Sequence, residues 1–339
     1  MLSFITPNTY LRQPRYKDLR EVLLQKTILK ILNLGENVFE DAVVPVAITL
    51  LINSKNNRTI DYVDLTSLLT KNNAYVLLLD IVFDEIKQID WLNTPNCIFV
   101  NTIIQKTKKS VALEEILTFK DAGINYQRIN VGLSQKGKSD LSKRLFYEGS
   151  REKNSDYEYW KGTDINQYYI SPTTNRFCRT NIMLSENERV ILNKEYFSIY
   201  PKLIWRQTAP YPICSIDYDG IWFGRSIQAG LINKKYQKDV SYEFLCGLLN
   251  SKYLRYLYEQ NVKEGGRVFP QVKLEHLKPL PIIIDKVKQS EIESLVSQII
   301  SEKKRNLRSD TKDWERKIDR LVYNMYELTD DEIKTIENG

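Results

Sequence analysis

The sequence is poor in the residues that most often carry catalysis and metal binding. It has one histidine, His276, and four cysteines that are widely spaced, with no C-x-x-C pair. Cys97, Cys178, Cys214 and Cys246 therefore predict neither a zinc site nor a disulfide framework, and we expect reduced thiols. His276 lies in KLEHLKPLPI, where prolines and apolar residues indicate a structural role. Neither catalysis by histidine nor a bound metal is expected of this chain.

Phosphate-binding loops and membrane spans are also missing. With only 13 glycines, the sequence contains neither G-x-G-x-x-G nor a P-loop, and no G-x-S-x-G or H-E-x-x-H motif is found. The longest apolar run, residues 43–52, is interrupted by Pro45 and has about half of the roughly 20 residues that span a bilayer. The N-terminus lacks the pattern of a signal peptide. We therefore expect a cytoplasmic protein without membrane contact.

The composition that is present fits a globular protein with a polyanionic partner. A chain of 339 residues predicts two domains, and 42% hydrophobic with 27% charged residues is typical of a folded chain. The net charge of +6 permits binding to nucleic acid without requiring it. Many of the 21 tyrosines lie near basic residues, as in DYEYWKGTDINQYYI and SKYLRYLYEQ. Such tyrosines either stack on bases or pack within the fold.

The first hundred residues predict part of an α/β sheet. Residues 2–6 form a predicted strand, 15–26 a helix with Leu19, Val22 and Leu23 on one face, and 28–34 and 43–53 two further strands. The order is strand, helix, strand, strand. An α/β sheet buries both faces and usually has more strands. We therefore expect additional strands to come from elsewhere, or the first strand to be covered in another way.

The remainder of the chain predicts a different architecture. A short strand at 57–65, a helix at 75–86 and a strand at 97–104 precede an irregular, β-rich region that starts near residue 113. The polar, basic residues 132–156 predict a mobile loop, and Ser241 predicts the N-cap of one helix reaching residue 265. Helical periodicity returns from residue 288. The predicted fold class is a partial α/β methyltransferase-like sheet, followed by an irregular α+β, β-rich recognition domain and C-terminal helices, with boundaries at 1–112, 113–285 and 286–339.

Several motifs resemble a known family. FITPNTYLRQPRYKDLREVLLQKTILKILNLGENVFEDAVVPVAITLL resembles the later half of the catalytic domain of adenine-specific DNA methyltransferases. Four later motifs resemble the TaqI-like C-terminal specificity domain of restriction-modification enzymes: YWKGTDINQYYI, PKLIWRQTAPYPICSIDYDGIWFG, GRVFPQVKLEHLKPLPI and KIDRLVYNMYELTDDEI. The resemblance extends over nearly the whole chain. It implies recognition of a DNA sequence within a restriction-modification system.

The resemblance also implies what this chain lacks. In the family, the cofactor loop and the catalytic Asn-Pro-Pro-Tyr loop precede the segment that matches here. The nearest similar stretches, TPN at residues 6–8 and SPT at 171–173, lack the double proline and the aromatic residue. No catalytic residue is therefore expected on this chain, and no cofactor is expected to bind it alone. An N-terminal methyltransferase half or subunit would supply S-adenosylmethionine and the catalytic loop for methylation of adenine.

The matching motifs give candidate site residues. Phe39 lies in LGENVF, where the family carries an aromatic that stacks on the flipped adenine; a core phenylalanine is the alternative. Arginine and lysine contact phosphates, whereas arginine, asparagine and glutamine discriminate bases. The candidates for DNA contact are Lys161, Arg206, Gln207, Arg225, Arg267, Gln271 and Lys273. Weaker candidates beside the DNA backbone are Arg12, Arg15, Lys17 and Arg20.

Other functions remain open from the sequence. The chain could modify DNA by itself through an unrecognised site, or persist as a non-catalytic remnant that serves as an interaction module. A type I specificity subunit shares the strand and helix pattern and the ending LPI. Those subunits usually carry two recognition domains joined by long helices, and only one such domain is found here.

Overall fold

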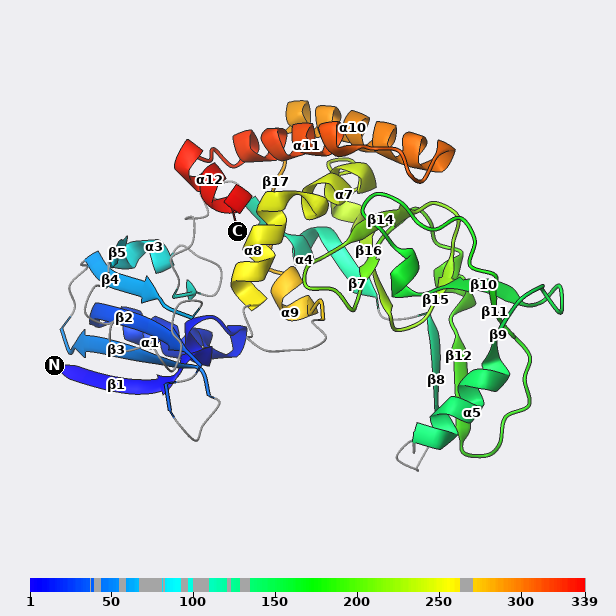
Figure 1. The fold of residues 1–339 in the computed structure, drawn as a ribbon, viewed down its shortest axis with the longest axis horizontal. Coiled ribbons are helices and arrows are strands. Elements are labelled where there is room, and N and C mark those ends of the chain that lie inside the picture. The colour runs from blue at the N-terminus through cyan, green and yellow to red at the C-terminus, as the bar shows by residue number, and fades with distance from the viewer. Residues whose placement is uncertain are drawn as a thin grey trace. The chain divides into compact units, whose positions relative to one another are not determined.

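The fold was analysed in a computed structural model. It describes residues 1–36, 38–39, 44–54, 59–66, 81, 83–92, 97–99, 110–120, 123–128, 135–262 and 271–338. The chain divides into a smaller compact unit, Met1–Lys106 with Gln260–Lys263, and a larger one, Thr107–Glu259 with Glu264–Gly339. Each is described by itself below (Figure 1). The division into 1–112, 113–285 and 286–339 stays a prediction.

The smaller unit is built on one mixed sheet. Its elements are β1 (Leu2–Pro7), α1 (Lys17–Leu24), β2 (Thr27–Gly35), β3 (Val46–Ile52), β4 (Thr59–Asp64), β5 (Asp84–Lys87) and α3 (Gln88–Leu92). The strand order is β1-β3-β2-β4-β5, in which β2 and β4 are parallel and the other neighbours antiparallel. The predicted order of strand, helix, strand, strand is observed at the start of this unit.

Some local predictions for this unit are wrong. Residues 84–86, predicted as the end of a helix, lie in β5, and residues 97–99, predicted as strand, are not in one. The rest of those two segments, except residues 81 and 83, lies outside the described residues. Helix α1 also turns another face inward, because Leu19 and Val22 are 44% and 52% exposed whereas Arg20, Leu23 and Leu24 are buried. Spacing alone did not reveal that an arginine occupies the buried face.

Aromatic rings fill the core of the smaller unit. Trp91 stacks on Phe99 with ring centroids 4.6 Å apart and meets Tyr62 edge to face at 5.9 Å. Around them lie the buried apolar residues of α1, β2 and β3, such as Ile28, Ile31 and Ala47. Because the packed rings bury a large apolar area, this cluster accounts for much of the unit's stability.

The larger unit contains several small sheets. One has the order β14-β13-β16-β7 and is antiparallel throughout, with strands β7 (Leu117–Lys120), β13 (Lys202–Arg206), β14 (Cys214–Asp217) and β16 (Ile227–Ile232). A second has the order β15-β10-β11-β9, with β9 (Phe146–Glu148), β10 (Tyr157–Trp160), β11 (Arg176–Cys178) and β15 (Trp222–Phe223). Two pairs complete the set: β8 (Ile124–Arg128) with β12 (Glu188–Leu192), and β6 (Ser110–Ala112) with β17 (Pro281–Ile283).

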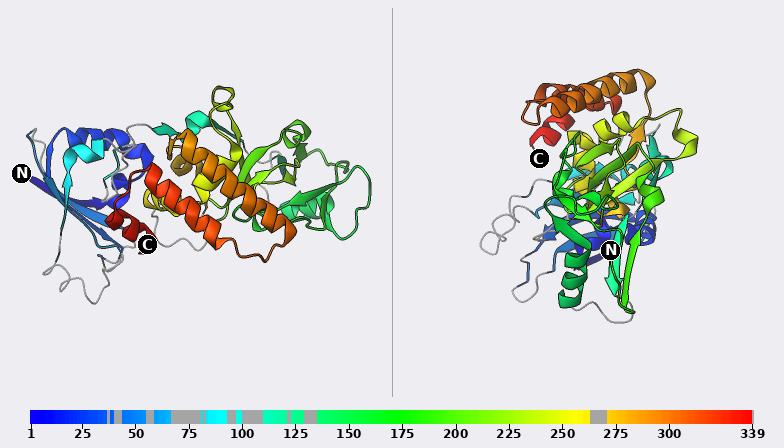
Figure 2. Two further views of the ribbon diagram at one scale, coloured as in Figure 1. Left: turned by 90° about the horizontal axis from the view of Figure 1, so that it is seen from above. Right: turned by 90° about the vertical axis from the view of Figure 1, so that its right-hand side faces the viewer.

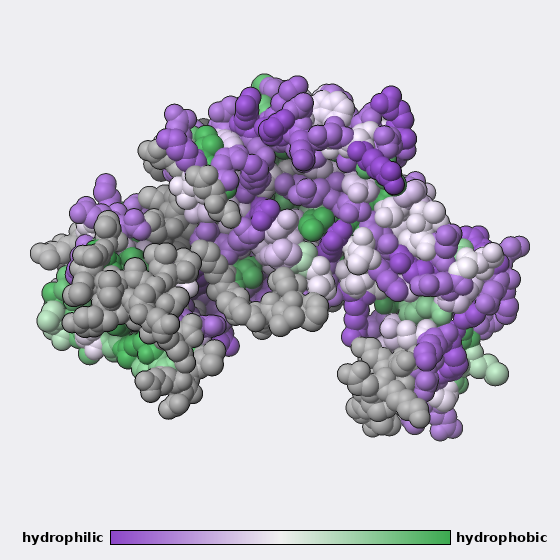
Figure 3. All heavy atoms as spheres, viewed as in Figure 1, coloured by the Kyte–Doolittle hydropathy of each residue, from purple (hydrophilic) through white to green (hydrophobic). Residues whose placement is uncertain are grey.

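Helices complete the larger unit. They are α4 (Leu113–Ile116), α5 (Gln135–Leu145), α6 (Lys194–Phe197), α7 (Tyr242–Asn250), α8 (Lys252–Val262), α9 (Leu274–Leu277), α10 (Lys286–Arg305), α11 (Lys312–Met325) and α12 (Asp330–Asn338). The last residues of α8, from Gln260 on, are counted with the smaller unit. Helices α10 and α11 run side by side across one face (Figure 2), and their outer surface is mainly hydrophilic (Figure 3). None of the helices in the described ranges is long and apolar enough to cross a membrane. The predicted mixed α/β fold with C-terminal helices is therefore observed.

Four further predictions can be compared with the structure here. The segment 132–156 is not simply a loop, because its described part contains α5 and β9. Ser241 is the predicted N-cap, and its Oγ accepts the Phe244 N–H at 3.0 Å. His276 is buried, in α9, and all four cysteines are free and buried. The N-cap prediction for Ser241 is confirmed, and the burial of His276 and the cysteines agrees with packing within the fold.

The single helix predicted after Ser241 is two helices. The chain is extended at Ser251, between α7 and α8. The amide of Asn250 exchanges hydrogen bonds with the backbone of Cys214, its Oδ1 accepting from N–H and its Nδ2 donating to the carbonyl, both at 2.9 Å. Asp319 of α11 then accepts the Lys252 N–H at 2.8 Å. Tertiary hydrogen bonds therefore end one helix and begin the next.

The burial of Asp319 predicts a pH dependence of stability. Burial raises the pKa of Asp319 to about 6. The Asp319 carboxyl therefore keeps its proton to a higher pH in the folded protein than in the unfolded chain. Its protonated form contributes stability that is lost as the pH rises from about 4 through about 6. Asp319→Asn is expected to raise the free energy of unfolding by roughly 1–3 kcal/mol at pH 8 and to change it little at pH 4. Urea unfolding at both pH values measures this. The exposed Asp313 of the same helix provides the control, Asp313→Asn, and an equal gain from Asp319→Asn at both pH values would contradict the prediction.

Candidate nucleic-acid interface

Segments far apart in sequence meet at the ends of two sheets in the larger unit. Strands β10 and β15 are parallel and both end there, so Lys161 and Arg225 follow neighbouring strands. Strand β13 ends at Arg206 opposite Ile227, the first residue of β16. Because β16 begins two residues after Arg225, the ends of β10, β13 and β15 lie together.

Backbone hydrogen bonds tie these segments to one another. Ser226 accepts the Gly162 N–H at its Oγ, at 3.0 Å, and the Gln207 N–H at its carbonyl, at 2.9 Å. The Gln207 carbonyl in turn accepts the Val272 N–H at 2.7 Å, and Thr208 forms a bridge with Gln271. We call the surface formed by Lys161, Gln207, Arg225, Gln271 and Lys273 the strand-end face.

The side chains of the strand-end face are accessible. Lys161, Arg225 and Gln271 are exposed, and Gln207 and Lys273 are half-buried. The Arg225 guanidinium donates to Asn125 Oδ1 at 2.7 Å. This contact leaves other N–H groups of the guanidinium available and orients them, since the guanidinium carries five donors in a fixed plane. Five of the seven DNA-contact candidates thus lie on one surface.

Arg206 and Arg267 are exceptions among the candidates. The Arg206 guanidinium donates to the Ile165 carbonyl at 2.5 Å and to Asn166 Oδ1 at 3.1 Å. These hydrogen bonds hold the Arg206 side chain against the loop after β10, so it does not extend from the strand-end face. Arg267 lies outside the described residues. The role of each candidate at DNA stays a prediction.

Sequence reasoning missed two side chains that build the face. Asn125 lies 100 residues before the arginine that it holds, and Ser226 joins two segments through its hydroxyl and its carbonyl. No local signal marks either residue, because their partners are brought close only by the sheets. Thr208, which is exposed beside Gln271, was missed as well, although it follows the candidates Arg206 and Gln207 directly.

The basic residues of the smaller unit divide into two groups. Arg20 is fully buried and donates to the carbonyls of Tyr10 at 2.6 Å and Gln13 at 2.9 Å, and burial lowers its pKa to about 10. Arg12 is 9% exposed and pairs with Asp64 at 2.7 Å. The prediction that these two arginines lie beside a DNA backbone is corrected, since their guanidinium groups stabilise the unit internally.

Arg15, Lys17 and Phe39 are accessible. Arg15 is exposed beside the Tyr16 ring, and Lys17 pairs with Glu21 across one helical turn at 3.5 Å. Phe39 follows β2 and is 44% exposed. The alternative reading of Phe39 as a core residue is therefore wrong, whereas its contact with a base stays a prediction.

A buried ion pair fixes a turn near the second sheet. Lys202 and Asp217 are fully buried, with Nζ and Oδ2 2.7 Å apart. Asp217 also accepts the backbone N–H groups of residues 219–221, at 2.8 to 3.2 Å. Gly220 has φ +74°, and a Cβ there would lie 2.4 Å from the Phe197 carbonyl oxygen, so only glycine suits this position. The turn is held by charge and backbone conformation together.

Part of this unit matches a known domain family. Residues 157–282 match the TaqI-like C-terminal specificity domain. This part of the chain is therefore similar to such a specificity domain, as the sequence motifs predicted, and it includes the whole strand-end face. The motif at 317–333 lies outside the matched range, in α11 and α12. No curated protein matches the sequence.

Solved structures give weaker similarity. The chain is similar to the type IIL restriction-modification enzyme MmeI in complex with DNA, with a TM-score of 0.47 and 12% identity over 98% of this chain and 48% of that one. The type IIG restriction endonuclease BpuSI is similar with a TM-score of 0.33 and 13% identity, over 96% of this chain and 47% of that one. The HsdS subunit from Thermoanaerobacter tengcongensis is similar with a TM-score of 0.31 and 12% identity, over 64% of this chain and 44% of that one. The chain thus spans about half the length of each, and similarity of this degree carries no argument about activity.

Proposed function

We propose that this chain recognises a short DNA sequence as the specificity part of a restriction-modification system. The match of residues 157–282 to a TaqI-like specificity domain carries the proposal. The strand-end face supports it, because four separate segments bring basic and amide side chains to one surface. The cytoplasmic location expected from the sequence belongs to the same proposal.

The chemistry of the face suits duplex DNA. An arginine held in one orientation can form two hydrogen bonds to O6 and N7 of guanine, and a glutamine amide can do the same with N6 and N7 of adenine. Arg225 and the pair Gln207 and Gln271 are therefore assigned to base contacts. Lys161 and Lys273 are assigned to phosphates, which position the protein without reading sequence.

The test is selection of duplexes from a random pool by the purified chain at near-physiological salt, where non-specific phosphate binding is weak. Enrichment of one short motif that contains adenine is the expected result. The variant Gln207→Ala/Gln271→Ala should lose that enrichment and retain weak, salt-dependent binding. A pool that stays random, from a folded chain that binds DNA, would contradict sequence recognition by this chain.

The proposal extends to a methyltransferase partner. A separate half or subunit would supply the S-adenosylmethionine site and the catalytic loop, and this chain would be inactive without it. The smaller unit would then contribute Phe39, whose accessible ring suits stacking on a flipped adenine. Mixing this chain with such a partner should produce methylation of adenine, reduced by Phe39→Ala. A stable complex without activity would contradict this extension and leave DNA recognition untouched.

A type I specificity subunit fits the same observation. Both assignments require a methyltransferase partner, and both place DNA recognition in residues 157–282. They differ in the number of recognition domains that the assembled enzyme uses. A palindromic or single selected motif favours the methyltransferase half, and a motif in two parts separated by a spacer favours the type I assembly.

A further inference from the structure

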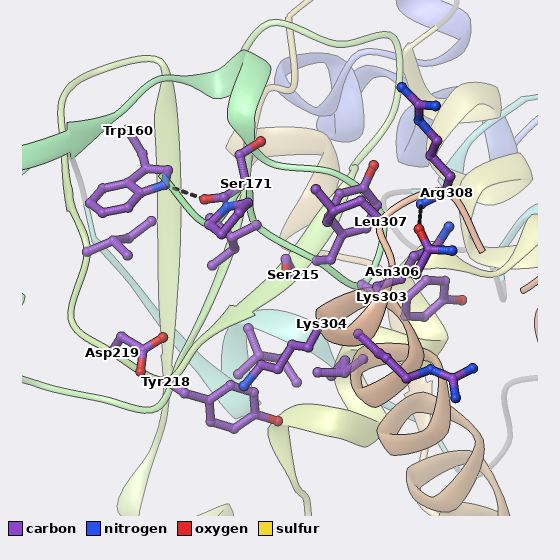
Figure 4. Close-up of a pocket in the computed structure, with 18 residues that line it drawn as sticks. Trp160, Ser171, Ser215, Tyr218, Asp219, Lys303, Lys304, Asn306, Leu307 and Arg308 are labelled. Carbon is purple, nitrogen blue, oxygen red and sulfur yellow. Dashed lines mark hydrogen bonds between the residues drawn. The ribbon is translucent and has the colours of Figure 1, made fainter. Parts of the chain in front are cut away.

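The larger unit contains a pocket that is separate from the strand-end face. Its volume is about 700 Å³, within the range of roughly 300–1,000 Å³ that is typical of ligand sites. Three parts of the chain form its walls: Trp160 with residues 168–172, β14 with the turn that follows it, and the end of α10 with residues 306–308. Figure 4 shows that Trp160 and Tyr218 lie on separate walls.

Hydrogen bonds fix both aromatic walls. The Trp160 Nε1–H donates to the Ser171 carbonyl at 2.7 Å, and the Tyr218 hydroxyl donates to Glu243 Oε1 at 2.7 Å. Each ring therefore has its polar end engaged and offers its apolar surface to the pocket. A planar ligand would find these surfaces already in place, so little conformational entropy is lost on binding.

Some of the basic side chains around the pocket have polar partners within the protein, and others have no ion pair in the described part of the chain. Lys303 Nζ donates to the Ser309 carbonyl at 2.8 Å, and Arg305 pairs with Glu302 at 2.8 Å. Within the described ranges, Lys304 and Arg308 have no ion pair, although both line the pocket. The Lys304 side chain extends from α10 toward Tyr218, with Nζ 5.6 Å from the ring centroid (Figure 4). An anionic group of a ligand would meet this ammonium directly.

Asp219 supplies the opposite charge. Its side chain lies on the wall near Tyr218, and in the described part of the chain it has no cationic partner. A carboxylate in this place accepts hydrogen bonds from N–H groups. The pocket thus combines aromatic surfaces with a cationic side chain that can bind a ligand anion and a carboxylate that can accept hydrogen bonds from a ligand's N–H groups.

From this combination we infer that the pocket binds a nucleoside monophosphate. The base lies against Trp160, its amino edge donates to Asp219, and the phosphate pairs with Lys304. Guanine is preferred to uracil because its N1–H and amino group present two adjacent donors to the carboxylate, whereas uracil presents one N–H between two carbonyl oxygens that the carboxylate repels. The nucleotide is either free in solution or an unstacked nucleotide of a DNA strand, and both present the same chemistry. This inference does not depend on the strand-end face.

Calorimetric titration of the full chain with GMP, UMP and inorganic phosphate tests the first source. We expect GMP to bind more tightly than UMP and phosphate alone to bind far more weakly than either. Lys304→Gln should lower the affinity for GMP roughly tenfold, the loss expected for a charge-assisted hydrogen bond. Lys304 is exposed, so this variant is expected to fold. Lys312→Gln, an exposed lysine at the start of α11, is the matched control and should leave the affinity unchanged.

A duplex with one extrahelical guanosine tests the second source. If free GMP does not bind, the bulged duplex should still bind more tightly than the intact one, and Lys304→Gln should remove that difference. Either result supports the inference and identifies the source. The inference would be overturned if the chain neither binds GMP nor prefers the bulged duplex, or if Lys304→Gln and Lys312→Gln lose the same affinity. If the duplex selection described above yields no motif, the GMP titration and the bulged-duplex measurement remain valid, because neither depends on sequence recognition by the strand-end face.

Discussion

Replacing Asp217 with alanine is expected to lower the free energy of unfolding by about 3–5 kcal/mol. The substitution leaves Lys202 fully buried without its counter-ion, and among the described residues the Ile199 carbonyl alone remains to accept a hydrogen bond from Nζ, at 2.9 Å. It also removes the acceptor of three backbone N–H groups in the turn 219–221. Chemical denaturation of the full chain, followed by circular dichroism, measures the loss.

Two variants separate the buried charge from other causes. Asp313→Ala removes an exposed partner of Arg316 and should leave the denaturation midpoint unchanged, since exposed pairs contribute little. The double variant Lys202→Met/Asp217→Ala should be more stable than Asp217→Ala alone, because it removes the unpaired ammonium as well. If the double variant is less stable than Asp217→Ala, the unpaired charge is not the cause of the destabilisation.

Replacing Arg225 with alanine is expected to weaken binding to the selected duplex about 10- to 100-fold. This corresponds to the roughly 1–3 kcal/mol that a bidentate contact contributes to base discrimination. The loss should be confined to one base position, where the wild type distinguishes bases and the variant does not. Fluorescence anisotropy with the selected duplex and its single-base substitutions measures both effects.

The charge and the orientation of Arg225 can be tested separately. Arg225→Lys keeps the charge and should retain non-specific binding while losing discrimination, because lysine lacks the planar pair of donors. Asn125→Ala removes the acceptor that orients the guanidinium and should have a smaller effect in the same direction. Arg316→Ala, on α11, should change nothing. A uniform loss over all duplexes would assign Arg225 to a phosphate, and no loss would remove it from the interface.

The sequence determined the features that depend on neighbouring residues. The order of the first elements, the N-cap at Ser241 and the C-terminal helices follow from hydrophobic periodicity and capping. The specificity domain was predicted from motifs, and residues 157–282 match it. Lys161 and Gln271 were selected from the sequence because they lie in those motifs, and Arg225 because it follows one of them directly. All three are exposed.

The tertiary structure decided which charged groups are available and what holds them. Arg20 was predicted at the surface, but it is buried, and the backbone carbonyls of Tyr10 and Gln13 accept hydrogen bonds from its Nη1. The single helix after Ser241 is divided because Asn250 and Asp319 form hydrogen bonds with distant backbone groups. Asn125 reaches Arg225 across 100 residues. Contacts of this kind leave no local pattern in a sequence, because they depend on how sheets and helices bring remote segments together.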